Sequence, residues 1–102
     1  MTTDDWRREL ANVPLPHGAI EHSVGQWFRK DDDSVVRVFN YRVWAGSGWR
    51  VNLSGLQNAD GSVADRWIGS NEWRVGDPTA AREVSAACAA ASDELARLRE
   101  DD

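Results

Sequence analysis

The residues best suited to chemistry in this sequence are one cysteine and two histidines, and their spacing assembles no site. His17 and His22 lie beside two prolines and a glycine, far from Cys88, so the ligand spacing of a metal motif is missing. Cys88 falls on the apolar stripe of an Ala-rich helical pattern, where a thiol packs as a small buried hydrophobe. The aspartates at 31–33 lack the alternating ligands of a calcium loop and indicate a solvated turn. We therefore predict no metal, no cofactor and no enzymatic activity.

The second chemical feature is the pairing of tryptophan with arginine, because both residue types are enriched at protein-binding hot spots. The six pairs are Trp6 with Arg7, Trp27 with Arg29, Trp44 with Arg42, Trp49 with Arg50, Trp67 with Arg66, and Trp73 with Arg74. In a strand, adjacent residues face opposite sides, whereas residues two apart share a side. We therefore expect Trp27 with Arg29 and Trp44 with Arg42 to be the surface pairs, and the other four tryptophans to face inward.

Length and composition place these residues in one small domain, residues 1–102. The chain has 102 residues, a formal net charge of −5 and a single cysteine. This length supports one hydrophobic core, and a lone cysteine forms no intramolecular disulfide, which is typical of a reducing compartment. There is no apolar run of ~18 residues and no basic leader, so we expect a cytoplasmic protein without membrane contact. The acidic balance disfavours nucleic acid as a partner.

Alternating hydrophobicity predicts an antiparallel β-meander of three to four strands. The expected strands cover residues 19–29, 35–45, 49–55 and 62–69, after a short N-terminal helix over 4–12. Gly-Ser-Gly at 46–48 and Asn-Ala-Asp-Gly at 58–61 are hairpin signals, and Gly61 suits a positive φ. Such a sheet leaves one face that needs a cover.

A long C-terminal helix is predicted to supply that cover, which makes the fold class α+β. Asp77 is suited to the N-cap and Pro78 to the first helical turn. The apolar residues recur three or four apart, at Ala81, Val84, Cys88, Ala91, Leu95 and Leu98. We expect this stripe to pack on the sheet. A coiled-coil seam is the alternative, although it would extend over fewer than the three or four heptads that such seams usually need.

The face opposite that helix is the predicted binding surface. Strict alternation along 35–45 places Val35, Phe39, Tyr41 and Val43 on one side. It places on the other side Val36, Val38, Arg42 and Trp44. Pairing through the 46–48 hairpin adds the polar residues of the next strand, Arg50, Asn52 and Ser54. Such a mixture is too apolar for a solvated face and too polar for a core, so we expect an interface.

Two segments of the C-terminal half form a recognisable arrangement. The first is Gly55-Leu56-Gln57-Asn58-Ala59-Asp60-Gly61-Ser62, and a strand follows it. The second is the helix with Asp77-Pro78-Thr79-Ala80-Ala81-Arg82-Glu83-Val84 and Ala91-Ser92-Asp93-Glu94-Leu95. This order of strand, Gln-x-x-Asp-Gly turn, strand and Ala-Arg-Glu helix resembles a group of small uncharacterised actinobacterial and actinophage proteins. The resemblance covers residues 50–98 and implies the same order of elements, without assigning an activity or site residues.

Together these patterns favour a non-enzymatic protein-binding module. We expect a small cytoplasmic protein, encoded by a phage or mobile element, that docks a host protein or a second copy of itself. The candidate binding residues are Arg42, Trp44, Val36, Val38 and Arg50, with Trp27 and Arg29 beside them. The alternative is a single-stranded nucleic-acid binder that stacks bases on the aromatic residues of the sheet, whose affinity would fall steeply with salt.

Overall fold

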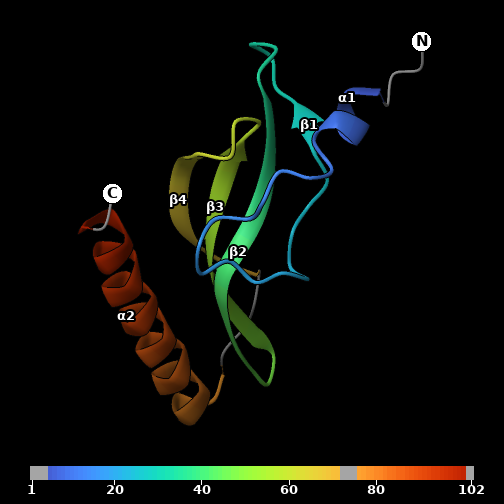
Figure 1. Ribbon diagram of the computed structural model, residues 1–102. Helices are drawn as coiled ribbons and strands as arrows, with labels where there is room; N and C mark the ends of the chain where they lie inside the picture. Colours follow the sequence, from blue (N-terminus) through green and yellow to red (C-terminus); the bar gives the residue numbers. More distant parts are fainter. Residues whose placement is uncertain (1–4, 72–75, 101–102) are drawn as a thin grey trace.

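The chain folds into a four-stranded antiparallel sheet with a long helix on one face (Figure 1). The computed structural model describes residues 5–71 and 76–100. The strands are β1 (Phe28–Arg29), β2 (Val35–Gly46), β3 (Trp49–Asn58) and β4 (Val63–Ser70), and they lie in this order across the sheet. The helices are α1 (Asp5–Glu9) and α2 (Pro78–Glu100). The predicted α+β architecture is therefore confirmed.

The strand predicted over 19–29 is mostly irregular. A turn at residues 21–22 interrupts it, and only β1 pairs as a ladder with β2. The rest follows the outer edge of β2 through single backbone hydrogen bonds, such as Ile20 N to Asn40 O at 2.9 Å and Gly25 N to Val38 O at 2.7 Å. This segment therefore covers much of an edge that would otherwise expose unpaired backbone groups.

A β-bulge at Tyr41 interrupts the alternation of β2 halfway along the strand. The residue before Tyr41 pairs with Ser54 and the residue after it pairs with Leu53, so Tyr41 has no partner of its own on β3. Residues directly opposite each other in an antiparallel pair share a face. Because the bulge adds one residue to β2, every later side chain moves to the opposite face.

The two faces of the sheet therefore contain different residues from those that strict alternation predicts. We call the side against α2 the helix face, and on β2 it carries Arg37, Phe39, Arg42 and Trp44. We call the other side the open face. It carries Phe28, Val36, Val38, Asn40, Val43, Ala45, Arg50, Asn52, Ser54, Leu56, Asn58, Asp65, Trp67 and Gly69. The predicted positions of Arg42 and Trp44 on the open face, and of Val43 on the helix face, are wrong because of the bulge.

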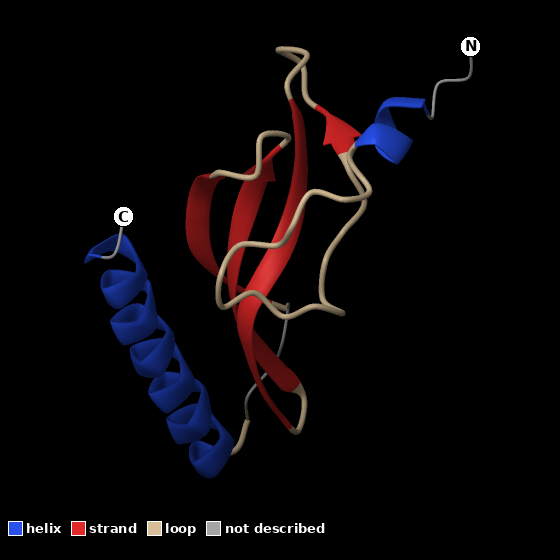
Figure 2. Cartoon of the chain, viewed as in Figure 1, coloured by secondary structure: helices blue, strands red, loops and turns tan. Residues whose placement is uncertain are grey.

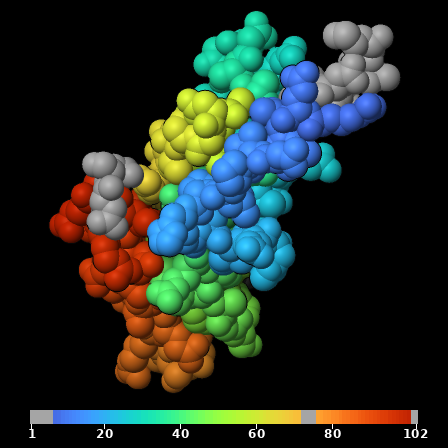
Figure 3. Space-filling view, in the orientation of Figure 1, coloured from blue at the N-terminus to red at the C-terminus, as the bar shows by residue number. Residues whose placement is uncertain are grey.

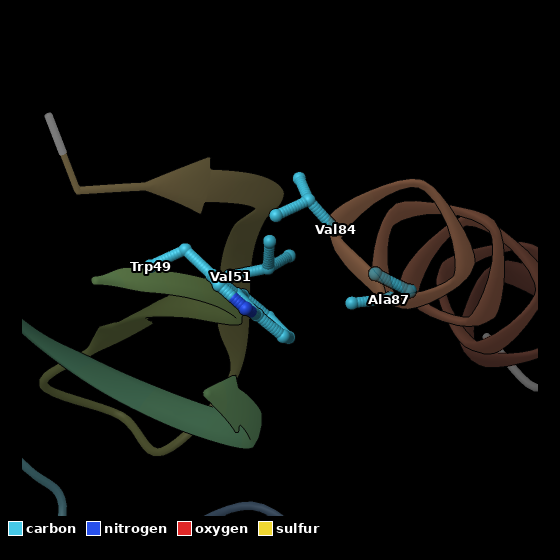
Figure 4. Close-up of a cluster of buried hydrophobic side chains, with 5 residues drawn as sticks. Trp49, Val51, Val84 and Ala87 are labelled. Atoms are coloured by element: carbon cyan, nitrogen blue, oxygen red, sulfur yellow. The ribbon is translucent and has the colours of Figure 1, made fainter. Parts of the chain in front are cut away.

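The core lies between α2 and the helix face. Val84, Ala87 and Ala91 of α2 pack with Trp49 and Val51 of β3 (Figure 4). The side chains of α2 in this contact are small, so the helix axis can lie close to the large indole ring. A second cluster of Phe39, Tyr41 and Leu53 is covered by Leu15, Ala19, Leu95 and Leu98.

The contact face of α2 is rotated relative to the predicted stripe. Val84 and Ala91 are buried as predicted, and Leu95 and Leu98 are half-buried. Ala87, and not Cys88, completes the contact, while Ala81 and Cys88 are exposed. Adjacent residues point about 100° apart around a helix, so a small rotation decides which of the two meets the sheet. The prediction of a buried Cys88 is wrong.

The N-terminal segment completes the cover of the helix face. After α1, residues 10–20 cross in front of β2 as an irregular loop (Figure 2). In the space-filling view this segment lies over the strand and beside α2 (Figure 3). Within residues 5–71 and 76–100, the helix face thus has two covering segments, whereas the open face carries no helix.

Candidate functional site

Arg42 and Trp44, the leading predicted pair, lie together on the helix face. The guanidinium carbon of Arg42 is 5.9 Å from the centroid of the Trp44 ring, which is a cation–π distance. Arg42 Nη1 lies 3.7 Å from Glu94 Oε2 on α2, and the Arg42 side chain is 59% exposed. Trp44 is half-buried against both core clusters. This pair therefore joins the sheet to α2.

Trp27 and Arg29 do not form the predicted surface pair. Trp27 is 6% exposed, and the guanidinium of Arg37 lies 4.4 Å from its ring centroid. Arg7 of α1 donates a hydrogen bond from Nε to the Trp27 carbonyl oxygen at 3.4 Å. Arg29 is exposed on β1. The arginine that stacks on the buried Trp27 ring is therefore Arg37 of β2, and not Arg29.

Arg37 and Gln57 form a buried polar cluster that strand alternation already implied, since Arg37 shares a side with Phe39. Arg37 Nε donates to Gln57 Oε1 at 2.7 Å, and Arg37 Nη2 donates to the Val13 carbonyl oxygen at 2.9 Å. Gln57 Nε2 donates to the carbonyl oxygens of Pro14 at 2.7 Å and Gly61 at 3.1 Å. Burial lowers the pKa of the Arg37 guanidinium. These bonds hold the N-terminal segment on the sheet.

The open face presents half-buried apolar side chains from all three long strands. Val38 and Leu56 are paired across β2 and β3, and Trp67 extends from β4. Three of the seven candidate binding residues lie on this face: Val38 half-buried, Arg50 exposed, and Val36 enclosed at 1% exposure. The predicted polar neighbours Asn52 and Ser54 lie there too. Sequence reasoning missed its other large apolar members, Phe28, Val43, Leu56 and Trp67. Phe28 is 42% exposed, unusually high for such a side chain.

A row of hydrogen-bonded polar side chains crosses the middle of the open face. Asn40 Nδ2 donates to Ser23 Oγ at 2.7 Å, and Ser54 Oγ donates to Asn40 Oδ1 at 2.5 Å. Asn52 Nδ2 donates to Ser54 Oγ at 2.6 Å. Each of these side chains is therefore held by its neighbour.

The described residues offer little for metal or ligand chemistry. Within residues 5–71 and 76–100, no three His, Cys, Asp or Glu side chains are grouped so that they could hold a metal ion. No pocket is found in the described part of the chain. None of the described helices combines the length and apolarity that are needed to cross a bilayer.

Comparison with known proteins adds no relative. No family model, no curated protein and no solved structure matches the chain.

Proposed function

We propose that this protein is a non-enzymatic docking module that binds a protein surface through its open face. The observation that carries the proposal is that one face of a four-stranded sheet bears Val38, Val43, Leu56 and Trp67 and has no helix over it in the described chain. Antiparallel sheets with a solvated face normally carry polar residues there. Apolar side chains on that face are explained when a partner covers them.

The composition of the open face fits a protein partner. Protein interfaces combine an apolar centre with a limited number of fixed hydrogen-bonding groups, and tryptophan and arginine are frequent anchors. Trp67 and the Val38–Leu56 pair supply the apolar area, and Arg50 is an exposed cation at the rim. Asp65 on the same face and the net charge of −5 would repel the phosphates of a single-stranded nucleic acid.

We place this docking in the cytoplasm. Cys88 is a free and exposed thiol. An exposed thiol stays reduced in the cytosol, whereas an oxidising compartment would favour intermolecular disulfides.

The test compares one apolar-to-amide substitution on the two faces of the sheet. Leu56→Gln changes the open face, and Ile68→Gln makes a similar change on the opposite face, where Ile68 is 37% exposed. Tagged protein is incubated with a nuclease-treated lysate of cells that also express the untagged chain, and the retained complex is footprinted with hydroxyl radicals. We expect Leu56→Gln to lose at least about tenfold in capture, because it exchanges apolar contact for an unpaired amide. Ile68→Gln should bind normally.

The footprint decides which face is covered. Trp67 and Ile68 are adjacent on β4 and point to opposite faces. In the complex, oxidation of Trp67 should fall while that of Ile68 stays unchanged. Equal capture by the two variants, protection of Ile68 alone, or loss of wild-type capture after nuclease treatment would contradict the proposal.

A further inference from the structure

We propose that the occupant of the open face is a second copy of this chain, packed antiparallel to the first in a symmetric dimer. This inference rests on the proposed docking function and specifies its partner. Three observations support a second copy: the exposed area of the chain, the two charges at the ends of the open face, and the relation of Trp67 to Gly69.

The chain exposes more surface than a compact monomer of its size. Its accessible surface is 7012 Å², whereas a compact monomer of 11.4 kDa exposes about 5,800 Å². Its radius of gyration is 16.0 Å, compared with about 13 Å for a typical domain of this length. The surplus of about 1,200 Å² exceeds the roughly 800 Å² that each partner buries in a standard interface. The chain therefore has enough surplus area for a contact of that size.

The open face carries one cation and one anion that cannot reach each other within a single copy. Arg50 lies at the start of β3, and Asp65 pairs with Leu56 near the other end of that strand. Six residues of extended strand separate their levels by about 20 Å. Neither side chain has an ion-pair partner among the described residues. When the strands of a second copy run in the opposite direction, the Arg50 of each chain lies level with the Asp65 of the other chain. The two side chains are then one strand spacing apart.

The two-fold axis that relates the two copies also brings the largest side chain of the open face, Trp67, opposite its smallest residue, Gly69. The level midway between residues 50 and 56 of β3 is that of Leu53. Trp67 pairs with Ser54 and Gly69 pairs with Asn52, one step to either side of this level. A two-fold axis at the level of Leu53 brings each Arg50 to the level of the other chain's Asp65. The same axis therefore sets each Trp67 over the Gly69 of the other chain. Face-to-face sheets pack with their strands nearly aligned, which this arrangement satisfies. An isologous interface contains each of these contacts twice.

The test is a charge exchange measured by sedimentation equilibrium of the purified chain over a wide concentration range. The variants are Arg50→Asp, Asp65→Arg and the double variant that carries both changes. Each single variant should weaken dimerisation at least about tenfold, because it sets two like-charged pairs in the symmetric interface. The double variant should return to within about threefold of the wild type, because the two attractive pairs are restored in reversed sense. Arg82→Asp, an equal charge change at an exposed position of α2, should have no effect.

Circular dichroism and urea midpoints establish that all four variants are folded. Dimerisation that is lost in both single variants and restored in the double variant supports the inference. A wild type that stays monomeric at millimolar concentration overturns it but leaves docking of a different protein on the open face intact. A wild-type dimer that is indifferent to either single reversal, or a double variant as weak as the single ones, also overturns it. A dimer that Leu56→Gln fails to weaken contradicts both this inference and the proposed function.

Discussion

Ala87 and Cys88 are adjacent on α2 but lie in opposite environments, so one substitution made at each position measures the rotation of the helix. Ala87 is 5% exposed and packs in the cluster with Trp49 and Val51, whereas Cys88 is exposed. Ala87→Asp places a carboxylate among apolar side chains, and an uncompensated buried charge costs about 3–5 kcal/mol. That is a large part of the roughly 5–15 kcal/mol that holds a typical domain folded. Cys88→Asp should change the stability by no more than about 0.5 kcal/mol.

Urea unfolding followed by tryptophan fluorescence gives both free energies. With a slope of about 1–3 kcal/mol per molar urea, Ala87→Asp should lower the midpoint by about 1 M or more. Cys88→Asp should leave it almost unchanged. Helix propensity does not explain the difference, because alanine and cysteine differ from aspartate by less than about 1 kcal/mol. A thiol reagent should also label Cys88 of the native protein nearly as fast as in denaturant. Similar midpoints for the two variants, or slow native labelling, would show that the helix meets the sheet through another face.

Two further predictions concern the turns and the close contacts of β3. Gly55→Ala should destabilise the protein by about 1–3 kcal/mol, because a methyl group there would lie 2.5 Å from the Phe39 ring. Gly76→Ala, where an added Cβ meets none of the described side chains or backbone within 4 Å, should have little effect in the same urea assay. Asp60 accepts hydrogen bonds from Ser62 Oγ at 2.5 Å and Ser62 N at 2.9 Å, which lower its pKa below the usual 3.8. A group whose pKa is lowered in the folded state stabilises the protein when the pH is above the pKa of the unfolded state. This stabilisation is lost as the pH falls through the pKa of the folded state. Below pH 3.8, therefore, the wild type should lose more stability than Asp60→Asn, and parallel acid limbs for the two proteins would contradict this.

The three long strands, their hairpins and the long helix were predictable because their signals are local. Trp49, Val51 and Leu53 alternate with polar residues, and all three are buried on one face. Gly48 and Gly61 have positive φ angles of 76° and 94° in the two hairpins, where a side chain would strain the backbone. Asp77 Oδ1 accepts a hydrogen bond from Thr79 N at 3.1 Å, so the predicted N-cap begins α2. Each of these features depends on a few consecutive residues.

The candidate surface was predictable only in part. Val38 and Arg50 lie on the open face as expected, but the bulge is what brings them together, because Val38 precedes Tyr41 and Arg50 pairs with Ala45 beyond it. Trp67 was expected to face inward because of its neighbour Arg66, yet its partner Ser54 places it on the open face. Leu56 continues the row of Asn52 and Ser54, so alternation implied its position on the open face. It was not recognised as an apolar member of that face because the other residues of the row are polar.

The sequence by itself determined the three long strands, their hairpin turns and the long helix, because those choices follow from backbone preferences and from periods of two or about 3.6 residues. Of the strand predicted over 19–29, only Phe28–Arg29 forms a ladder. The tertiary structure decided which side chains are covered. The bulge at Tyr41 exists only in the pairing of β2 with β3, and it moves Arg42 and Trp44 to the helix face. The choice of Ala87 over Cys88 depends on the rotation at which α2 meets Trp49 and Val51. A one-residue shift in register, or a rotation of about 100°, changes little within the element itself. Only the packing partner distinguishes the alternatives, so no local pattern can carry that information.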